Sequence, residues 1–90
     1  MITLSETKNY LRVDHNEDDK LILSLIDTAK RLVMDVGRMD EARLAVHEET
    51  TRQAMLYTAS YLYENRNGAD YKKLTLTLRA LLFAQREGVI

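Results

Sequence analysis

The sequence contains no cysteine and no proline, and only three of its 90 residues are glycine. Without cysteine the chain can form neither disulfide bonds nor thiolate metal sites. Proline and glycine supply many of the turns in all-β proteins, so their scarcity argues against that class. The sequence therefore predicts an all-α fold.

Long hydrophobic runs are also missing. No segment approaches the roughly 20 apolar residues of a membrane-spanning helix. The N-terminus, MITLSETKNY, lacks the basic and then apolar order of a signal peptide. We therefore expect no membrane partner, and a protein that is either intracellular or a virion component made in a host cytoplasm.

The chain also lacks a large net charge of either sign. The formal net charge is -1, with the cations dispersed among nearly equal anions. Proteins that bind DNA without sequence preference use clustered lysine and arginine to neutralise phosphates. A dedicated DNA-binding surface is therefore disfavoured.

What is present is the composition of a folded chain. Hydrophobic residues make up 46% of the sequence and charged residues 30%. Ninety residues provide for one small domain around a single core. We expect residues 1–90 to form a single-domain helical bundle of about four helices, one short at the N-terminus and two long.

Residues 50–68 are the expected centre of this fold. One stripe at helical spacing consists of Thr51, Met55, Thr58, Ala59 and Leu62. A second stripe consists of Ala54, Tyr57 and Tyr61. A helix with apolar residues on so much of its circumference contacts neighbours on more than one side. We expect it to span residues 50–66 and to stop at Asn67 and Gly68, since either can adopt the left-handed conformation.

The N-terminal part predicts a short helix over residues 4–11. Thr3 and Glu6 have the spacing of a capping box, in which each side chain satisfies a backbone amide at the start of the helix. A helix this short is not stable alone and must pack on the rest of the chain. Its expected packing residues are Leu4, Thr7, Tyr10 and Leu11.

A long helix is predicted over residues 17–36. Asp14 or Asn16 can cap its start, and Gly37 is expected to end it. Its expected packing residues are Leu21 or Ile22, then Leu25, Ile26, Ala29, Leu32, Val33 and Val36. The following segment, residues 40–45, is compatible with a helical turn or with an extended loop.

In the C-terminal part of the chain, a loop is predicted over residues 69–75. A last helix is predicted to start at a Thr75 or Thr77 cap and to run to about Arg86. Arg79 and Arg86 face away from its apolar stripe, and residues 88–90 are expected to be a frayed tail. The stripe consists of Leu78, Leu81, Leu82 and Gln85.

The acidic segment after residue 13 is the best candidate for a metal site. Asp14, Asn16 and Asp18 stand at alternate positions, as in an EF-hand loop. That loop also needs glycine at its sixth position and glutamate at its twelfth, where this chain has Asp19 and Leu25. Helix-capping acids explain the segment better. With no spaced histidine pair, nucleophile elbow or glycine-rich loop, we expect no enzyme activity, no cofactor and no metal.

The tyrosines are compatible with either core packing or a protein interface. Core packing is favoured for Tyr57 and Tyr61, whereas for Tyr63 with Arg66 the two interpretations are equal. The central helix also has more apolar surface than one long partner helix can cover, which favours self-association. The candidate interface residues are Tyr63, Glu64, Arg66, Arg79 and Arg86.

Three segments occur in the order found in a known family. Residues 10–14 (YLRVD) precede Asp18, Asp19 and the long amphipathic segment, and residues 62–66 (LYENR) close the central one. The third consists of Arg79, Leu81, Leu82 and Arg86. Together they resemble the tailed-phage head–tail connector family, the head-completion adaptors also called DNA-packaging proteins in phages and prophages. The prolines that often precede the family's central and last helices are absent.

The resemblance implies a structural protein. Members of the family form a ring, matched to the twelve-fold portal, that extends the DNA channel and docks the stopper or tail-completion protein. The duplex passes through without specific binding. The implied location is the virion neck, or the host cytoplasm before assembly or as a prophage product. We expect the helices over residues 17–36 and 50–66 to supply the ring contacts, and the segment from Thr75 to reach the portal.

The main alternative is a small DNA-binding regulator of the helix-turn-helix type. Such a protein needs a tight turn followed by a recognition helix rich in arginine, asparagine and glutamine. Here the loop before residue 75 is long and the helix after it is mostly leucine. An enzyme subunit or an antitoxin-like partner is a third interpretation.

Overall fold

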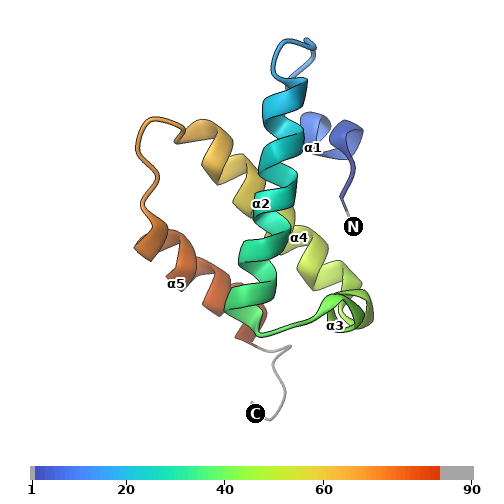
Figure 1. Ribbon diagram of the computed structural model, residues 1–90, viewed down its shortest axis with the longest axis vertical. Helices are drawn as coiled ribbons and strands as arrows, with labels where there is room; N and C mark the ends of the chain where they lie inside the picture. Colours follow the sequence, from blue (N-terminus) through green and yellow to red (C-terminus); the bar gives the residue numbers. More distant parts are fainter. Residues whose placement is uncertain (1, 84–90) are drawn as a thin grey trace.

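The computed structural model describes residues 2–83, and these form five α-helices and no strand (Figure 1). The predicted all-α class, the short N-terminal helix and the two long helices are confirmed. The additional helix is α3, in the segment over residues 40–45 for which the sequence allowed either a helical turn or an extended loop; the helical turn is correct. The elements are α1 (Leu4–Leu11), α2 (Asp19–Gly37), α3 (Glu41–Val46), α4 (Glu48–Glu64) and α5 (Tyr71–Leu82).

Helix α4 is the centre of the fold, as predicted, because it packs against each of the other four helices. In Figure 1, α2 crosses in front of it, α1 and α3 lie to its right, and α5 lies to its left. Its buried residues cover most of its circumference: Thr51, Ala54, Met55, Leu56, Thr58, Ala59 and Leu62. The four neighbouring helices thus cover the apolar surface that we expected to require a second copy.

Helices α2 and α5 complete the core around α4. The buried residues of α2 are Ile22, Ala29, Val33 and Gly37. The buried residues of α5 are Leu74, Leu78 and Leu82. Tyr57 and Tyr61 are partly buried against this core, and their rings stack with centroids 6.4 Å apart.

Three buried threonines have their hydroxyl groups satisfied within the helices. Thr7 donates to the carbonyl of Thr3 at 2.7 Å, and Thr58 donates to that of Ala54 at 2.8 Å. Thr51 donates to the carbonyl of Leu44 at 3.1 Å, which joins α4 to α3. Buried hydroxyls bonded in this way add no unsatisfied polar group to the core.

The predicted capping box at the start of α1 is confirmed. The Glu6 amide donates to Thr3 Oγ1 at 3.0 Å, and the Thr3 amide donates to Glu6 Oε1 at 3.4 Å. The prediction for its packing face was partly wrong, because Tyr10 is 46% exposed. Thr7 is buried as predicted, and Ile2 before the helix is buried as well.

The predicted ends of α2 need correction. No side chain caps its start, and Asn16 accepts a bond from Lys8 Nζ at 2.8 Å instead. Gly37 is helical, and Arg38 takes the left-handed position with φ of 54°. A Cβ on Gly37 would lie 3.2 Å from Leu82 Cδ1 and 3.2 Å from Met39 Cε. Glycine at this position therefore allows α5 to approach α2, and it does not form the turn.

The predicted end of α4 was wrong. The helix begins at Glu48 and ends at Glu64, followed by Asn65 at the C-cap. Neither Asn67 nor Gly68 adopts the left-handed conformation. The Asn65 side-chain amide donates to the carbonyl of Tyr61 at 2.8 Å, so an asparagine earlier in the sequence closes the helix.

Helix α5 begins four residues before the predicted Thr75 cap. The Asp70 carboxylate accepts a bond from the Lys73 amide at 3.1 Å, so Asp70 is the cap and Thr75 and Thr77 lie within the helix. The earlier start makes Leu74 a core residue, whereas Leu81 is 43% exposed. The predictions for Gln85, Arg86 and residues 88–90 fall outside the described residues.

Candidate functional site

The candidate site is a set of surfaces for protein contacts. Within residues 2–83, no group of histidine and acidic side chains is arranged to hold a metal ion. None of the described helices has both the length and the apolar character needed to cross a bilayer. The candidates are therefore surfaces where exposed apolar residues occur beside unpaired charges.

The first surface is the outer side of α5. Lys72, Leu76, Arg79 and Phe83 follow one another at spacings of four, three and four residues, so they form one exposed row along the helix. Leu76 is 54% exposed and Phe83 is 53% exposed. Helix α5 contains three basic residues and no acidic residue. We call this row the α5 outer face.

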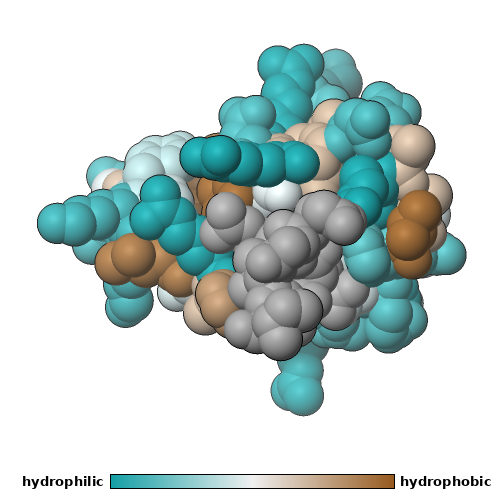
Figure 2. Space-filling model, turned by 90° about the horizontal axis from the view of Figure 1, so that it is seen from below, coloured by the Kyte–Doolittle hydropathy of each residue, from teal (hydrophilic) through white to brown (hydrophobic). Residues whose placement is uncertain are grey.

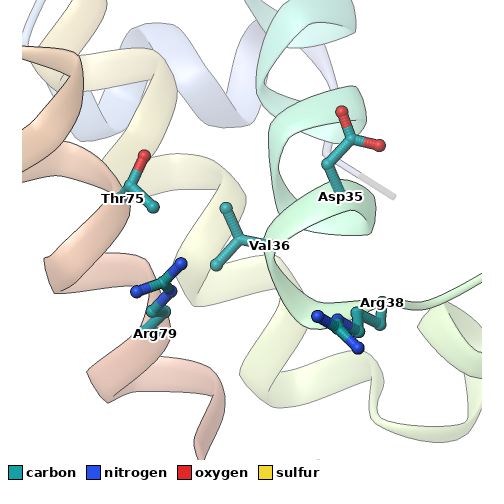
Figure 3. Close-up of a pocket in the computed structure, with 5 residues that line it drawn as sticks. All are labelled: Asp35, Val36, Arg38, Thr75 and Arg79. Carbon is teal, nitrogen blue, oxygen red and sulfur yellow. The ribbon is translucent and has the colours of Figure 1, made fainter.

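A groove of about 420 Å³ adjoins this face, between the end of α2 and α5. It is lined by Asp35, Val36, Arg38, Thr75 and Arg79. Figure 3 shows the side chains of Arg38 and Arg79 extending from opposite sides into the space near Val36. No hydrogen bond or ion pair joins either guanidinium group to another side chain among residues 2–83. Asp35 is the one acid in the lining, so the two arginines give the groove an excess of positive charge, which favours an acidic occupant.

Arg38 is held in this groove by an uncommon backbone conformation. Its φ of 54° is left-handed, and its amide donates to the carbonyls of Met34 and Asp35. For a residue other than glycine this conformation costs on the order of 1 kcal/mol. Arg12 takes the same left-handed conformation at the end of α1, with φ of 62°, so both arginines close helices in the way that glycine often does.

The second surface is the corner formed by α3 and the start of α4, and we call it the α3–α4 groove. Its volume is about 210 Å³, and its lining includes the buried side chains of Leu44 and Met55 with Glu41 and Glu48 at the rim. Val46 beside it is 70% exposed. Residues 40–49 include four acidic residues and one arginine, so this corner is acidic.

The rim acids of the α3–α4 groove differ in their partners. Glu41 Oε2 pairs with Lys30 Nζ at 3.0 Å, which ties α3 to α2. Glu49 pairs with Arg52 Nη2 at 3.3 Å. In the part of the chain that the structure describes, no side-chain partner is recorded for the exposed Glu48 carboxylate. Glu48 is therefore available to a cation from outside the chain.

The third surface lies at the end of α4 and contains three of the predicted interface residues, Tyr63, Glu64 and Arg66. The Tyr63 hydroxyl donates to Asp18 Oδ2 at 2.5 Å, and the Arg66 guanidinium lies 4.5 Å from the centroid of the Tyr63 ring. Arg66 Nη1 also donates to the carbonyl of Tyr63 at 2.5 Å. The polar groups of this pair are thus engaged within the chain, which leaves little for a partner.

The structure does not bring the five predicted interface residues together. Tyr63, Glu64 and Arg66 are at the end of α4, whereas Arg79 lines the groove beside α5. Arg86 lies outside the described residues. Arg38 and Glu48 were not among the residues predicted from the sequence. The available signal was their position as charged residues at helix ends, Arg38 after Gly37 and Glu48 next to Glu49.

The hydrogen bond to Asp18 raises the pKa of Tyr63 above its ordinary value of about 10, with further contributions from burial and from the Asp18 charge. The folded chain therefore holds this proton to higher pH than the unfolded chain does. The stability that the bond provides is fully present below pH 10, and it is lost as the pH rises through the folded-state pKa.

This shift predicts a late step in a titration of tyrosinate absorbance. One of the five tyrosines should ionise after the others, and Asp18→Asn should move that step to lower pH because the carboxylate charge is gone. Tyr10→Phe is the control, since Tyr10 is exposed and its loss should leave the late step in place. An unchanged titration in Asp18→Asn would show that Asp18 does not control Tyr63.

Two ion pairs join helix α1 to the core, in addition to the buried side chains of Ile2 and Thr7. Glu6 Oε2 pairs with Arg52 Nη1 on α4, and Lys8 Nζ pairs with Asp19 Oδ1 on α2 at 2.8 Å. The bond from Glu6 and the charges of Glu49 and Glu6 raise the pKa of Arg52. These contacts keep α1 in place and leave no unpaired charge there for a partner.

Comparison with known proteins gave one match. A protein-family model described as "Phage gp6-like head-tail connector protein" matches residues 1–84, which is almost the whole chain. Neither the curated proteins nor the solved structures gave a match.

Proposed function

This chain belongs to the phage gp6-like head–tail connector family, and from that membership we propose that it completes the phage head as a ring of identical copies below the portal. The family is structural and non-enzymatic, and it implies assembly with portal and tail proteins. In this proposal the ring extends the DNA channel and presents a platform to which the stopper or tail-completion protein binds. A twelve-fold ring would match the portal.

The match over residues 1–84 is the observation that carries this proposal. Two properties of the chain support it. Exposed hydrophobic residues are found on different sides of the molecule, among them Leu76, Phe83 and Val46, as a subunit with neighbours on two sides requires. The net charge of -1 also suits a channel through which DNA must slide, because a strongly basic lining would hold the duplex.

Gene deletion tests the proposal. A phage or induced prophage without this gene should yield DNA-filled heads and separate tails, because the platform for the tail is missing. Electron microscopy counts joined particles, and plaque titre measures infectivity. Expression of the intact chain from a plasmid should restore both. Joined, infectious particles in the deletion strain would contradict the proposal.

A DNA-binding regulator receives less support from the same residues. Helix α5 has one arginine and neither asparagine nor glutamine, so it lacks the side chains of a recognition helix. Gel retardation at low salt separates the two functions. The connector proposal predicts no discrete complex with duplex DNA, whereas a regulator would form one.

A further inference from the structure

Helices α5 and α3, which contribute to the α5 outer face and the α3–α4 groove, lie on opposite sides of the molecule, at the lower left and lower right of Figure 1. We propose that the α5 outer face of one copy docks into the α3–α4 groove of a second copy of this chain. This inference rests on the proposed function, since it identifies the contact that repeats around the ring.

The two surfaces are complementary in charge. Helix α5 has three basic residues and no acidic one, whereas residues 40–49 have four acidic residues and one arginine. Opposite charges on facing surfaces steer association and fix the register of the contact. Two α5 faces, or two α3–α4 corners, would repel each other, so a symmetric dimer through either surface is disfavoured.

The surfaces are also complementary in apolar character. On α5, Leu76 is exposed one turn from Arg79, and Phe83 is exposed one turn further on. At the α3–α4 groove the exposed apolar side chain is Val46, whereas Leu44 and Met55 form an apolar floor that is almost wholly buried. Figure 2, seen from below, shows hydrophobic surface near both the left and the right edge of this end of the molecule.

Arg79 and Glu48 are the pair that the docking brings together. Asp35 is the one acid in the lining of the groove beside α5, and it forms no ion pair with Arg38 or Arg79. No side chain among residues 2–83 pairs with the Glu48 carboxylate. Entry of Glu48 between the two guanidinium groups would form charge-assisted hydrogen bonds without breaking an existing ion pair. Glu41 is the weaker candidate because it already pairs with Lys30.

Because the two surfaces lie on opposite sides of one copy, they determine the kind of assembly that the contact can form. Each copy uses one surface for the neighbour before it and the other for the neighbour after it, which is a heterologous contact. Repeated heterologous contacts close into a ring when the rotation between copies allows it. In this proposal the interface comes from α5 on one copy and from α3 with the start of α4 on the next.

Charge reversal tests the inference. Arg79→Glu and Glu48→Arg should each reduce assembly on the purified portal protein of the same phage by on the order of tenfold or more, because each places like charges in contact. The double variant Arg79→Glu with Glu48→Arg should recover part of the lost assembly, since this pair is formed again with its charges exchanged while Arg38 is unchanged. Lys20→Glu is the control, as Lys20 is exposed on α2 and belongs to neither surface.

Native mass spectrometry gives the number of copies bound per portal, and circular dichroism confirms that each variant is folded. If the wild-type chain forms no ring on the portal, the proposed function fails. If both single variants assemble like the wild type, this interface is wrong while the proposed function stands. If the single variants fail and the double variant does not recover, the residues contact the portal or tail protein, and the inference is also overturned.

Discussion

Replacing Leu78 with alanine should lower the free energy of unfolding by about 3 kcal/mol. Leu78 is fully buried, and α5 packs there against both α2 and α4. Truncation removes buried methyl groups and leaves a cavity that three helices cannot close without moving. Urea denaturation followed by circular dichroism measures the change.

The same helix provides the control for this prediction. Leu76 is two residues away and 54% exposed, so Leu76→Ala should change the free energy of unfolding by less than about 0.5 kcal/mol. Equal losses in the two variants would show that α5 does not present Leu78 to the core. Leu76→Ala should still weaken ring assembly if the α5 outer face is an interface.

Replacing Gly37 with valine should cost about 1–3 kcal/mol of folding stability. A Cβ at this position would lie 3.2 Å from side-chain atoms of both Leu82 and Met39, and the γ-methyl groups of valine would come closer still. The end of α5 would have to move away from α2. Thermal and urea unfolding of the purified variant measure the loss.

Gly68 is the matched control for Gly37. Nothing lies within 4 Å of a Cβ built on Gly68, and its φ is not left-handed. Gly68→Ala should therefore leave the stability unchanged or raise it by up to about 1 kcal/mol, because alanine restricts the unfolded chain. A loss of stability in Gly68→Ala together with none in Gly37→Val would contradict the packing described for the end of α2.

The sequence predicted those parts of the fold that depend on local spacing. The capping box of α1 uses residues three apart, and the stripe through Met55 and Leu62 follows the helical period, so both are visible in the sequence. The start of α5 was missed because two threonines, Thr75 and Thr77, compete as caps with Asp70. Only the burial of Leu74 against the core decides between them.

The candidate site was harder to predict because its contacts join distant residues. Tyr63 and Arg66 have the composition of an interface, but Tyr63 bonds to Asp18, 45 residues away. The sequence indicated Gly37 as the end of α2, but Arg38 takes the left-handed position, and Gly37 lies where a Cβ would meet Leu82. The α5 outer face became visible only after the helix was placed, since its exposed row depends on which leucines are buried.

The most direct test is an electron cryomicroscopy reconstruction of the portal vertex of the phage that encodes this chain. Our account predicts a ring of copies coaxial with the portal, equal in number to the portal subunits, with α5 of each copy against α3 and α4 of the next. A neck without this polypeptide, or single copies bound without contact to one another, would contradict it.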